Sequence, residues 1–172
     1  MNIQNVNALS VQEFVDVFGA AYEHSPWIAE RAALNRPFAD LKTMLQAFSE
    51  VVKSSGEAVQ LKLVRAHPEL GHRAGVDPEL GAASASEQAS AGLDRLSPEE
   101  YSRFKVLNEA YLQKFGMPFV ICVRLAGQGA AKTVIMDAME RRLEGSAKEE
   151  LVEALMQIDA IAGLRIKDIV TQ

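Results

Sequence analysis

The sequence predicts an all-α fold, a single helical domain of about eight helices over residues 1–172. Two observations favour this class: signals for helix starts recur along the chain, and prolines and glycines fall between the segments that they begin. In addition, only residues 119–123 have a strand-like composition, and one strand without a partner cannot form a sheet. A chain of 172 residues can bury a sizeable core, so folding needs no disulfide or metal.

Four predicted helix starts carry a serine that is followed three residues later by a glutamate. In such a capping box the serine hydroxyl accepts from a backbone N–H, while the glutamate reaches back to the N–H of the serine. These pairs predict helices that begin directly after the serine: Ser10 with Glu13, Ser84 with Glu87, Ser97 with Glu100, and Ser146 with Glu149.

Proline, aspartate and glycine set the other boundaries. Pro26 can occupy the first position of a helix after Ser25, because that position needs no N–H. That helix ends before Pro37, since the residue before a proline avoids the α conformation. Several glycines and Pro78 predict an irregular loop at residues 70–83. The remaining helices are expected from Asp40 to about Ser54, from Glu57 to Ala66, from Pro98 to about Phe115, from Lys132 to Leu143 and from Lys148 to Ile169.

The composition excludes several classes of partner. A net charge of −5 argues against nucleic-acid binding, which needs a basic surface. No apolar run approaches the ~20 residues that span a bilayer, and the first residues lack a secretory signal. The single cysteine, Cys122, lies in an apolar run and predicts a small buried side chain. We therefore expect a cytoplasmic protein with no membrane or nucleic-acid partner.

The sequence His-Pro-Glu-Leu-Gly at residues 67–71 is the strongest chemical signal. Pro68 keeps the backbone of His67 out of the helical conformation, so the imidazole lies at a corner. Its ordinary pKa of about 6.5 makes histidine the usual proton carrier. The alternative is a structural histidine that closes a helix, where a positive ring suits the dipole. We expect no metal site, because His67 and His72 lack the i, i+4 spacing that one helix face offers to zinc.

Residues 84–88 place a carboxylate and an amide beside several small side chains. Glu87 and Gln88 are flanked by alanines and serines, which leave room for a ligand near free N–H groups at a helix start. The alternative for Glu87 is a purely structural cap, as expected for the other three capping glutamates.

Arg165 lies on the apolar face of the last predicted helix. Leu155, Ile158, Ala162 and Ile169 have helical spacing, and Arg165 fills a gap in their stripe. A buried guanidinium needs a partner, and its planar fork matches a carboxylate. Arg165 therefore either binds an anionic substrate or forms an ion pair with an interior Asp or Glu.

Residues 119–123 present backbone N–H and C=O groups that no sheet would satisfy. We expect this run to be extended buried backbone or the start of a helix. Buried backbone groups must be paired, so either a ligand rich in amides or ordinary turn and helix pairing would satisfy them.

Three motifs together resemble the 2-oxo-4-hydroxy-4-carboxy-5-ureidoimidazoline (OHCU) decarboxylase family. They are His-Pro-Glu-Leu-Gly at 67–71, Ser-x-x-Glu-Gln-x-x-Ala-Gly-Leu at 84–93 and Phe-Gly-Met-Pro-Phe-Val-Ile-Cys-Val-Arg at 115–124. The resemblance extends from about residue 8 to residue 170. It implies an all-α, cofactor-free enzyme, usually a homodimer, that converts OHCU to (S)-allantoin and CO2 in the last step of urate oxidation.

By the same resemblance, His67 would be the catalytic histidine and Arg165 an active-site arginine, and we expect Glu87 to be catalytic with them. The family often has an arginine two residues before Arg165, where this chain has Gly163. The resemblance implies no metal site, and the substrate-binding residues would be Pro68, Ser84, Ala85, Ser86, Glu87, Gln88, Phe119, Val120, Ile121, Cys122 and Val123.

The implied reaction needs no cofactor, because the substrate has its own electron sink, a C=N bond beside the carbon that loses CO2. His67 would move the proton, Glu87 would orient the imidazole or the substrate hydroxyl, and Arg165 would steer the anion. Two other functions stay open at this point: a helical interaction module without chemistry, and a decarboxylase or hydrolase of another ureido acid.

Overall fold

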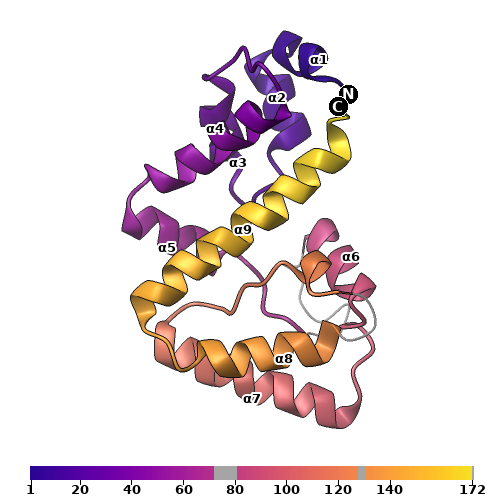
Figure 1. Cartoon of the computed structure of the whole chain (residues 1–172), viewed down its shortest axis with the longest axis vertical. Helices are drawn as coiled ribbons and strands as arrows, with labels where there is room; N and C mark the ends of the chain where they lie inside the picture. The colour runs from indigo at the N-terminus through magenta and orange to yellow at the C-terminus, as the bar shows by residue number, and fades with distance from the viewer. Residues whose placement is uncertain (72–80, 128–130, 172) are drawn as a thin grey trace. The chain divides into compact units, whose positions relative to one another are not determined.

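The fold is all-α, as the sequence predicts (Figure 1). The computed structural model describes residues 1–71, 81–127 and 131–171. Within these ranges it contains no strand, nine α-helices and one 3₁₀ helix: α1 (Ile3–Ala8), α2 (Val11–Phe18), α3 (Pro26–Ala33), α4 (Leu41–Lys53), α5 (Glu57–Arg65), α6 (Ala82–Ser90), α7 (Pro98–Phe115), η1 (Val123–Leu125), α8 (Ala131–Arg142) and α9 (Ala147–Ile169). No helix in these ranges is both long enough and apolar enough to cross a membrane.

The chain divides into two compact units. Unit 1 comprises Met1–Leu63 and Ile158–Gln172, and unit 2 comprises Val64–Gln157. The helix α9 runs through the boundary, so its first part belongs to unit 2 and its last part to unit 1. That residues 1–172 form one domain stays a prediction.

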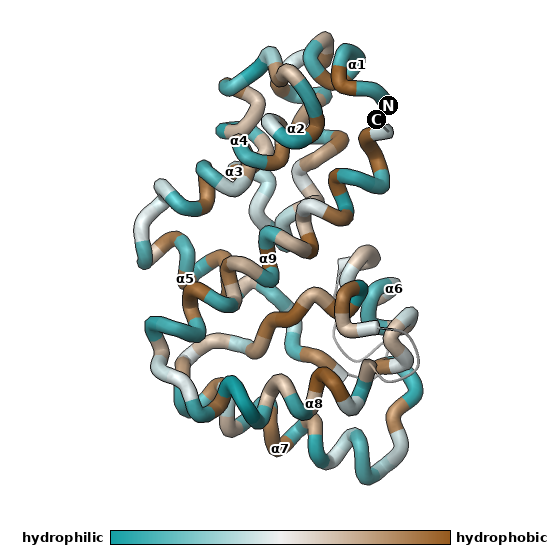
Figure 2. The backbone as a smooth tube through the Cα atoms, in the orientation of Figure 1, coloured by the Kyte–Doolittle hydropathy of each residue, from teal (hydrophilic) through white to brown (hydrophobic). Residues whose placement is uncertain are grey.

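Unit 1 has a core of aromatic rings contributed by α2, α4 and the segments around them. The ring centroid of Phe14 lies 4.8 Å from that of Phe18 and 5.8 Å from that of Phe48, and Tyr22 stacks on Phe48 at 6.1 Å. The helix α3 packs against both α2 and α4. Figure 2 shows hydrophobic and hydrophilic residues alternating along these helices, as expected for helices with one buried face.

Unit 2 is built on the pair α7 and α8, which pack against each other (Figure 1). One face of α7 is apolar and buried, and it is formed at helical spacing by Phe104, Leu107, Tyr111 and Phe115. At the end of α7, Gly116 adopts the left-handed conformation (φ 66°) that glycine tolerates without steric cost. The chain then reverses into residues 117–122, which have no regular secondary structure and lead into η1.

Three of the four predicted capping boxes are present. Ser10 and Ser97 accept from the N–H of Glu13 and Glu100, and both glutamates bond back to the N–H of the serine. The box at Ser146 is formed in the same way by Glu149.

The prediction for Ser84 is wrong, because α6 begins three residues earlier, at Ala82, with Gly81 as its N-cap. Ala82 and Ala83 are the strongest helix formers, which explains why the helix extends through them.

The helix α1 was not predicted from the sequence. Its capping box is formed by Asn2 and Asn5, which differ from the Ser-x-x-Glu pattern. Most of the loop predicted at residues 70–83, with His72, lies outside the described residues.

Candidate active site

His67 lies directly after α5, at the bend that Pro68 predicts. Its backbone N–H donates to the carbonyl of Val64 at 3.1 Å, which closes the end of the helix. The residue is buried, with 7% of its surface exposed. A buried imidazole on a bend is fixed in place by its backbone, which suits a group that must hold a proton at one position.

Gln88 joins α6 to the turn that follows His67. The Oε1 atom of Gln88 accepts from the N–H of Gly71 at 3.2 Å, and its Nε2 atom donates to the carbonyl of Glu69 at 3.3 Å. From α7, Asn108 Nδ2 donates to the carbonyl of Leu70 at 2.9 Å. The turn is therefore held from two helices by side-chain amides.

Gly71 ends this turn in a left-handed conformation that residues with a side chain rarely adopt. Its φ is 79°, and a Cβ atom there would lie 3.1 Å from a ring atom of Phe104 and 3.1 Å from Leu96 Cδ1. The turn and α7 can approach this closely because position 71 has no side chain.

The earlier start of α6 changes the setting of residues 84–88. Ser84 is inside the helix and buried, and the N–H of Ala85 already bonds to the carbonyl of Gly81 at 2.9 Å. The expected site of free N–H groups beside Ser84 is therefore shifted to the residues before it. Glu87 remains half-buried.

Residues 119–123 lie close to α6, because α6 packs against η1. Burial raises the pKa of the Cys122 thiol, and the negative charge of Glu87 raises it further. Cys122 is buried, as the sequence predicts. Within unit 2, α6 thus contacts both the turn that follows His67 and η1, which begins at Val123.

The backbone of residues 119–123 is held by two side chains that the sequence analysis did not identify. Arg142 Nη1 donates to the carbonyl of Val120 at 2.8 Å, and Gln157 Oε1 accepts from the N–H of Cys122 at 2.9 Å. Between them, the N–H and C=O of Ile121 have no hydrogen-bond partner among the described residues. Two adjacent peptide groups are thus each held at one end, by Arg142 or by Gln157, and each presents its other end, the N–H or the C=O of Ile121.

Arg165 is buried on its helix face, as predicted, and belongs to unit 1. Its Nη1 atom donates to Glu23 Oε2 at 3.1 Å and to the carbonyl of Ala21 at 3.3 Å. Glu23 is itself only 5% exposed. This is the interior ion pair that the sequence left open as the alternative to anion binding, and a role in substrate binding stays a prediction.

Comparison with known proteins decides between the functions that the sequence left open. A sequence model of the family described as OHCU decarboxylase matches residues 7–167. The 2-oxo-4-hydroxy-4-carboxy-5-ureidoimidazoline decarboxylase of Haloferax volcanii is 44% identical over 98% of this chain and 95% of its own. The chain belongs to the OHCU decarboxylase family. The predicted family is confirmed, and the protein is a carboxy-lyase of urate degradation.

Two further likenesses agree with this assignment. The uric acid degradation bifunctional protein PucL of Bacillus subtilis is 36% identical over 99% of this chain and 33% of its own length. A crystal structure of (S)-allantoin synthase superposes with a TM-score of 0.78 and 24% identity, covering 99% of this chain and 54% of that one. The latter supports the all-α fold.

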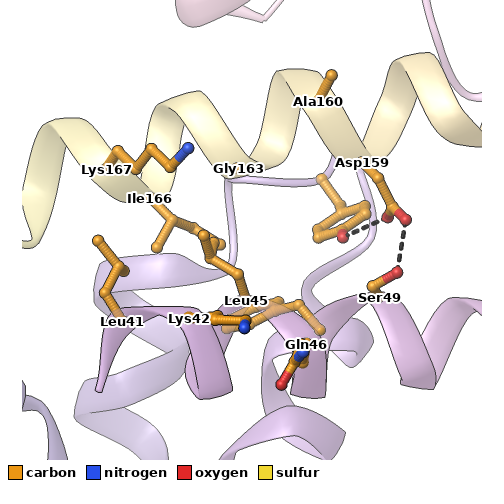
Figure 3. A pocket seen from close by; sticks show the side chains of 12 residues that line it. Leu41, Lys42, Leu45, Gln46, Ser49, Asp159, Ala160, Gly163, Ile166 and Lys167 are labelled. Atoms are coloured by element: carbon orange, nitrogen blue, oxygen red, sulfur yellow. Dashed lines mark hydrogen bonds between the residues drawn. The ribbon is translucent and has the colours of Figure 1, made fainter.

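This OHCU decarboxylase family member also has a cavity of about 460 Å³ in unit 1, shown in Figure 3. None of the predicted site residues lines it. At its edge Asp159 of α9 accepts from the hydroxyls of Tyr22 at 2.8 Å and Ser49 at 2.6 Å. Burial and the charge of Asp159 raise the pKa of Tyr22, so the phenol stays a donor. These bonds join three segments of the unit 1 core.

Proposed function

We propose that this OHCU decarboxylase forms (S)-allantoin stereoselectively and that His67 transfers the proton. The observation that supports this is the assembly in unit 2 of a buried imidazole, the Glu87 carboxylate and the free peptide groups of Ile121. An imidazole near neutral pKa can move a proton, a carboxylate can orient it, and peptide groups can hold a ureido function.

The reaction balances without an added cofactor. The bond between ring carbon C4 and its carboxylate breaks, CO2 leaves, and the electron pair of that bond forms a C4=C5 double bond. The π pair of the former C5=N bond moves onto the nitrogen, which takes up a proton from solvent. The C4 hydroxyl then loses its proton to become a carbonyl, and C5 gains a proton. The configuration of the product depends on the face of C5 that receives this proton.

His67 acts as the base toward the hydroxyl or as the acid toward C5 in this proposal. Glu87 orients the imidazole or the hydroxyl, and Ile121 binds the ureido group through its N–H and C=O. Gln88 uses one donor and one acceptor on the turn after His67. Its amide has a second N–H and a second lone pair that can bind the substrate.

The test follows the circular dichroism of allantoin after the protein is added to the freshly generated product of urate oxidation. Wild-type protein should form one enantiomer faster than the background reaction. His67→Asn should lose about 10²–10⁴-fold in rate, the usual contribution of a positioned acid or base.

His24→Asn is the matched control, because His24 is exposed and lies in unit 1. Its φ of 47° is one that asparagine tolerates. His24→Asn should therefore retain full activity. A folded His67→Asn variant that keeps the wild-type rate and enantiomeric purity would rule out this role for His67.

Two further properties belong to the proposal. The resemblance to the family supports a homodimer, and the single buried thiol of Cys122 suits a reducing, cytoplasmic compartment. Light scattering on the eluting peak of a sizing column gives the mass in solution, and a mass of 18.8 kDa rather than twice that value would reject the dimer.

A further inference from the structure

A buried ion pair in unit 2 contacts residues 119–123. Arg142, the last residue of α8, is 8% exposed, and Glu150 near the start of α9 is 4% exposed. The Nε atom of Arg142 donates to Glu150 Oε2 at 2.9 Å. The hydroxyl of Tyr111 in α7 donates to the same carboxylate oxygen. Three helices of unit 2 therefore meet at one carboxylate.

The guanidinium of Arg142 makes two contacts with the candidate substrate segment. Its Nη1 atom donates to the carbonyl of Val120 at 2.8 Å. Its face lies over the ring of Phe119, with the central carbon 4.4 Å from the ring centroid. A planar guanidinium can form an ion pair, donate to a carbonyl and stack on a ring at once, whereas an ammonium group cannot.

The energetics of the ion pair indicate that it has a role other than stabilising the fold. Removing two charges from water costs several kcal/mol, so a buried pair contributes little net stability and can often be replaced by apolar side chains without loss. Burial, together with the hydrogen bond to Glu150, raises the pKa of Tyr111 and keeps its hydroxyl a donor. The bonds to Glu150 therefore hold the Arg142 guanidinium in the position from which it donates to the carbonyl of Val120.

We propose that Arg142, held by Glu150, is a positioning residue for substrate binding in this OHCU decarboxylase. It fixes Val120 from one side, and Gln157 fixes Cys122 from the other. The peptide groups of Ile121 between them are thereby held ready for the substrate before it arrives, which lowers the ordering cost of binding. This inference rests on the proposed role of residues 119–123.

The test compares Arg142→Lys with Arg103→Lys. Arg103 of α7 also pairs with a glutamate, Glu140 of α8, but both side chains are about half exposed. The Arg142→Lys substitution keeps the positive charge but removes the planar guanidinium with its several N–H donors. We expect Arg142→Lys to raise KM by about three- to tenfold, the equivalent of one hydrogen bond, with kcat nearly unchanged. Arg103→Lys should change neither constant.

The double variant Arg142→Met with Glu150→Leu separates positioning from stability. It removes both charges together, so it should fold, yet it cannot hold Val120 and should also raise KM. A folded Arg142→Lys variant with wild-type KM would overturn the proposal. Failure of both variants to fold would also overturn it, because the network would then serve the fold. If the wild-type protein itself does not accelerate the formation of (S)-allantoin, the proposed function is rejected instead.

Discussion

Two guanidinium groups are buried in the described part of the chain, and each is held by one buried carboxylate. Arg165 and Glu23 connect α9 to the segment before α3 in unit 1, while Arg142 and Glu150 connect α8 to α9 in unit 2. A buried charge without its partner is far more costly than the pair, so each residue depends on the other. At the residue scale, the stability of these units should therefore be most sensitive to changes that remove one charge alone.

Glu23→Ala tests this dependence in unit 1. The substitution leaves Arg165 buried without its carboxylate, so it should lower the free energy of unfolding by about 3–5 kcal/mol. Glu140→Ala, which breaks the exposed pair with Arg103, should cost about 1 kcal/mol or less. Both values come from urea denaturation. A cost below 1 kcal/mol for Glu23→Ala would mean that Arg165 does not depend on Glu23.

At the scale of single elements, local chemistry at helix starts defines most of the architecture. Ser97 and Glu100 satisfy two N–H groups at the start of α7, and Pro98 occupies the first position. The side chain of Glu100 also reaches Lys132 of α8 at 2.9 Å. The hydrogen bond from the N–H of Ser97 and the contact with Lys132 lower the pKa of Glu100. The carboxylate form is therefore the one that stabilises the helix start.

Glu100→Gln should destabilise the protein in a way that depends on pH. Glutamine still accepts from the N–H of Ser97 but carries no charge. Because the folded pKa of Glu100 is lower than its unfolded value, the charge stabilises the fold above the ordinary pKa of about 4.3 and this benefit is lost as the pH falls through the folded pKa.

Urea denaturation of both proteins at pH 7 and pH 3 measures this effect. The variant should be less stable than wild type at pH 7, and the difference should shrink at pH 3. Glu109→Gln on the same helix, whose carboxylate makes only a 3.9 Å contact with Lys105, is the control. A constant difference at the two pH values would contradict the assigned cause.

The same element scale explains which parts of the fold the sequence predicts. Capping boxes and prolines are local, so the starts of α2, α3, α4 and α7 follow from residues at or directly before each helix start. The start of α6 was misplaced because serine favours a cap while the alanines before it favour helix, and the pattern gives no way to rank them.

Residues of the candidate site were predicted where a short stretch of sequence is enough to indicate a chemical role. His67 and Glu87 stand out by type and position, and Arg165 stands out because a charge interrupts an apolar stripe. Arg142 gives no such signal, since arginine at the end of a helix is expected to be exposed and to suit the dipole. Its contacts join residues far apart in the chain and need a structure to be seen.

At the scale of the whole molecule, α9 belongs to both compact units. It places Ala154 in the core of unit 2 and Ile158 in that of unit 1, within one continuous helix. Unfolding either unit removes the packing that stabilises its part of α9. Because helix formation is cooperative, we expect the loss to pass along the helix.

This predicts a single unfolding transition, as expected for one domain over residues 1–172. Trp27, the only tryptophan, lies in α3 and reports on unit 1, while far-UV circular dichroism reports on all helices. The two signals should give the same midpoint in urea. Separate midpoints would show that the units unfold independently.

The missing side chain at Gly71 has a consequence for how this protein can vary. Carbon atoms of Leu96 and Phe104 already occupy the space beside it, and residues other than glycine rarely adopt its backbone angle. A survey of all single-residue replacements should find this position among the least permissive in the chain, although it contributes no functional group. The position is restricted by the space that its neighbours fill.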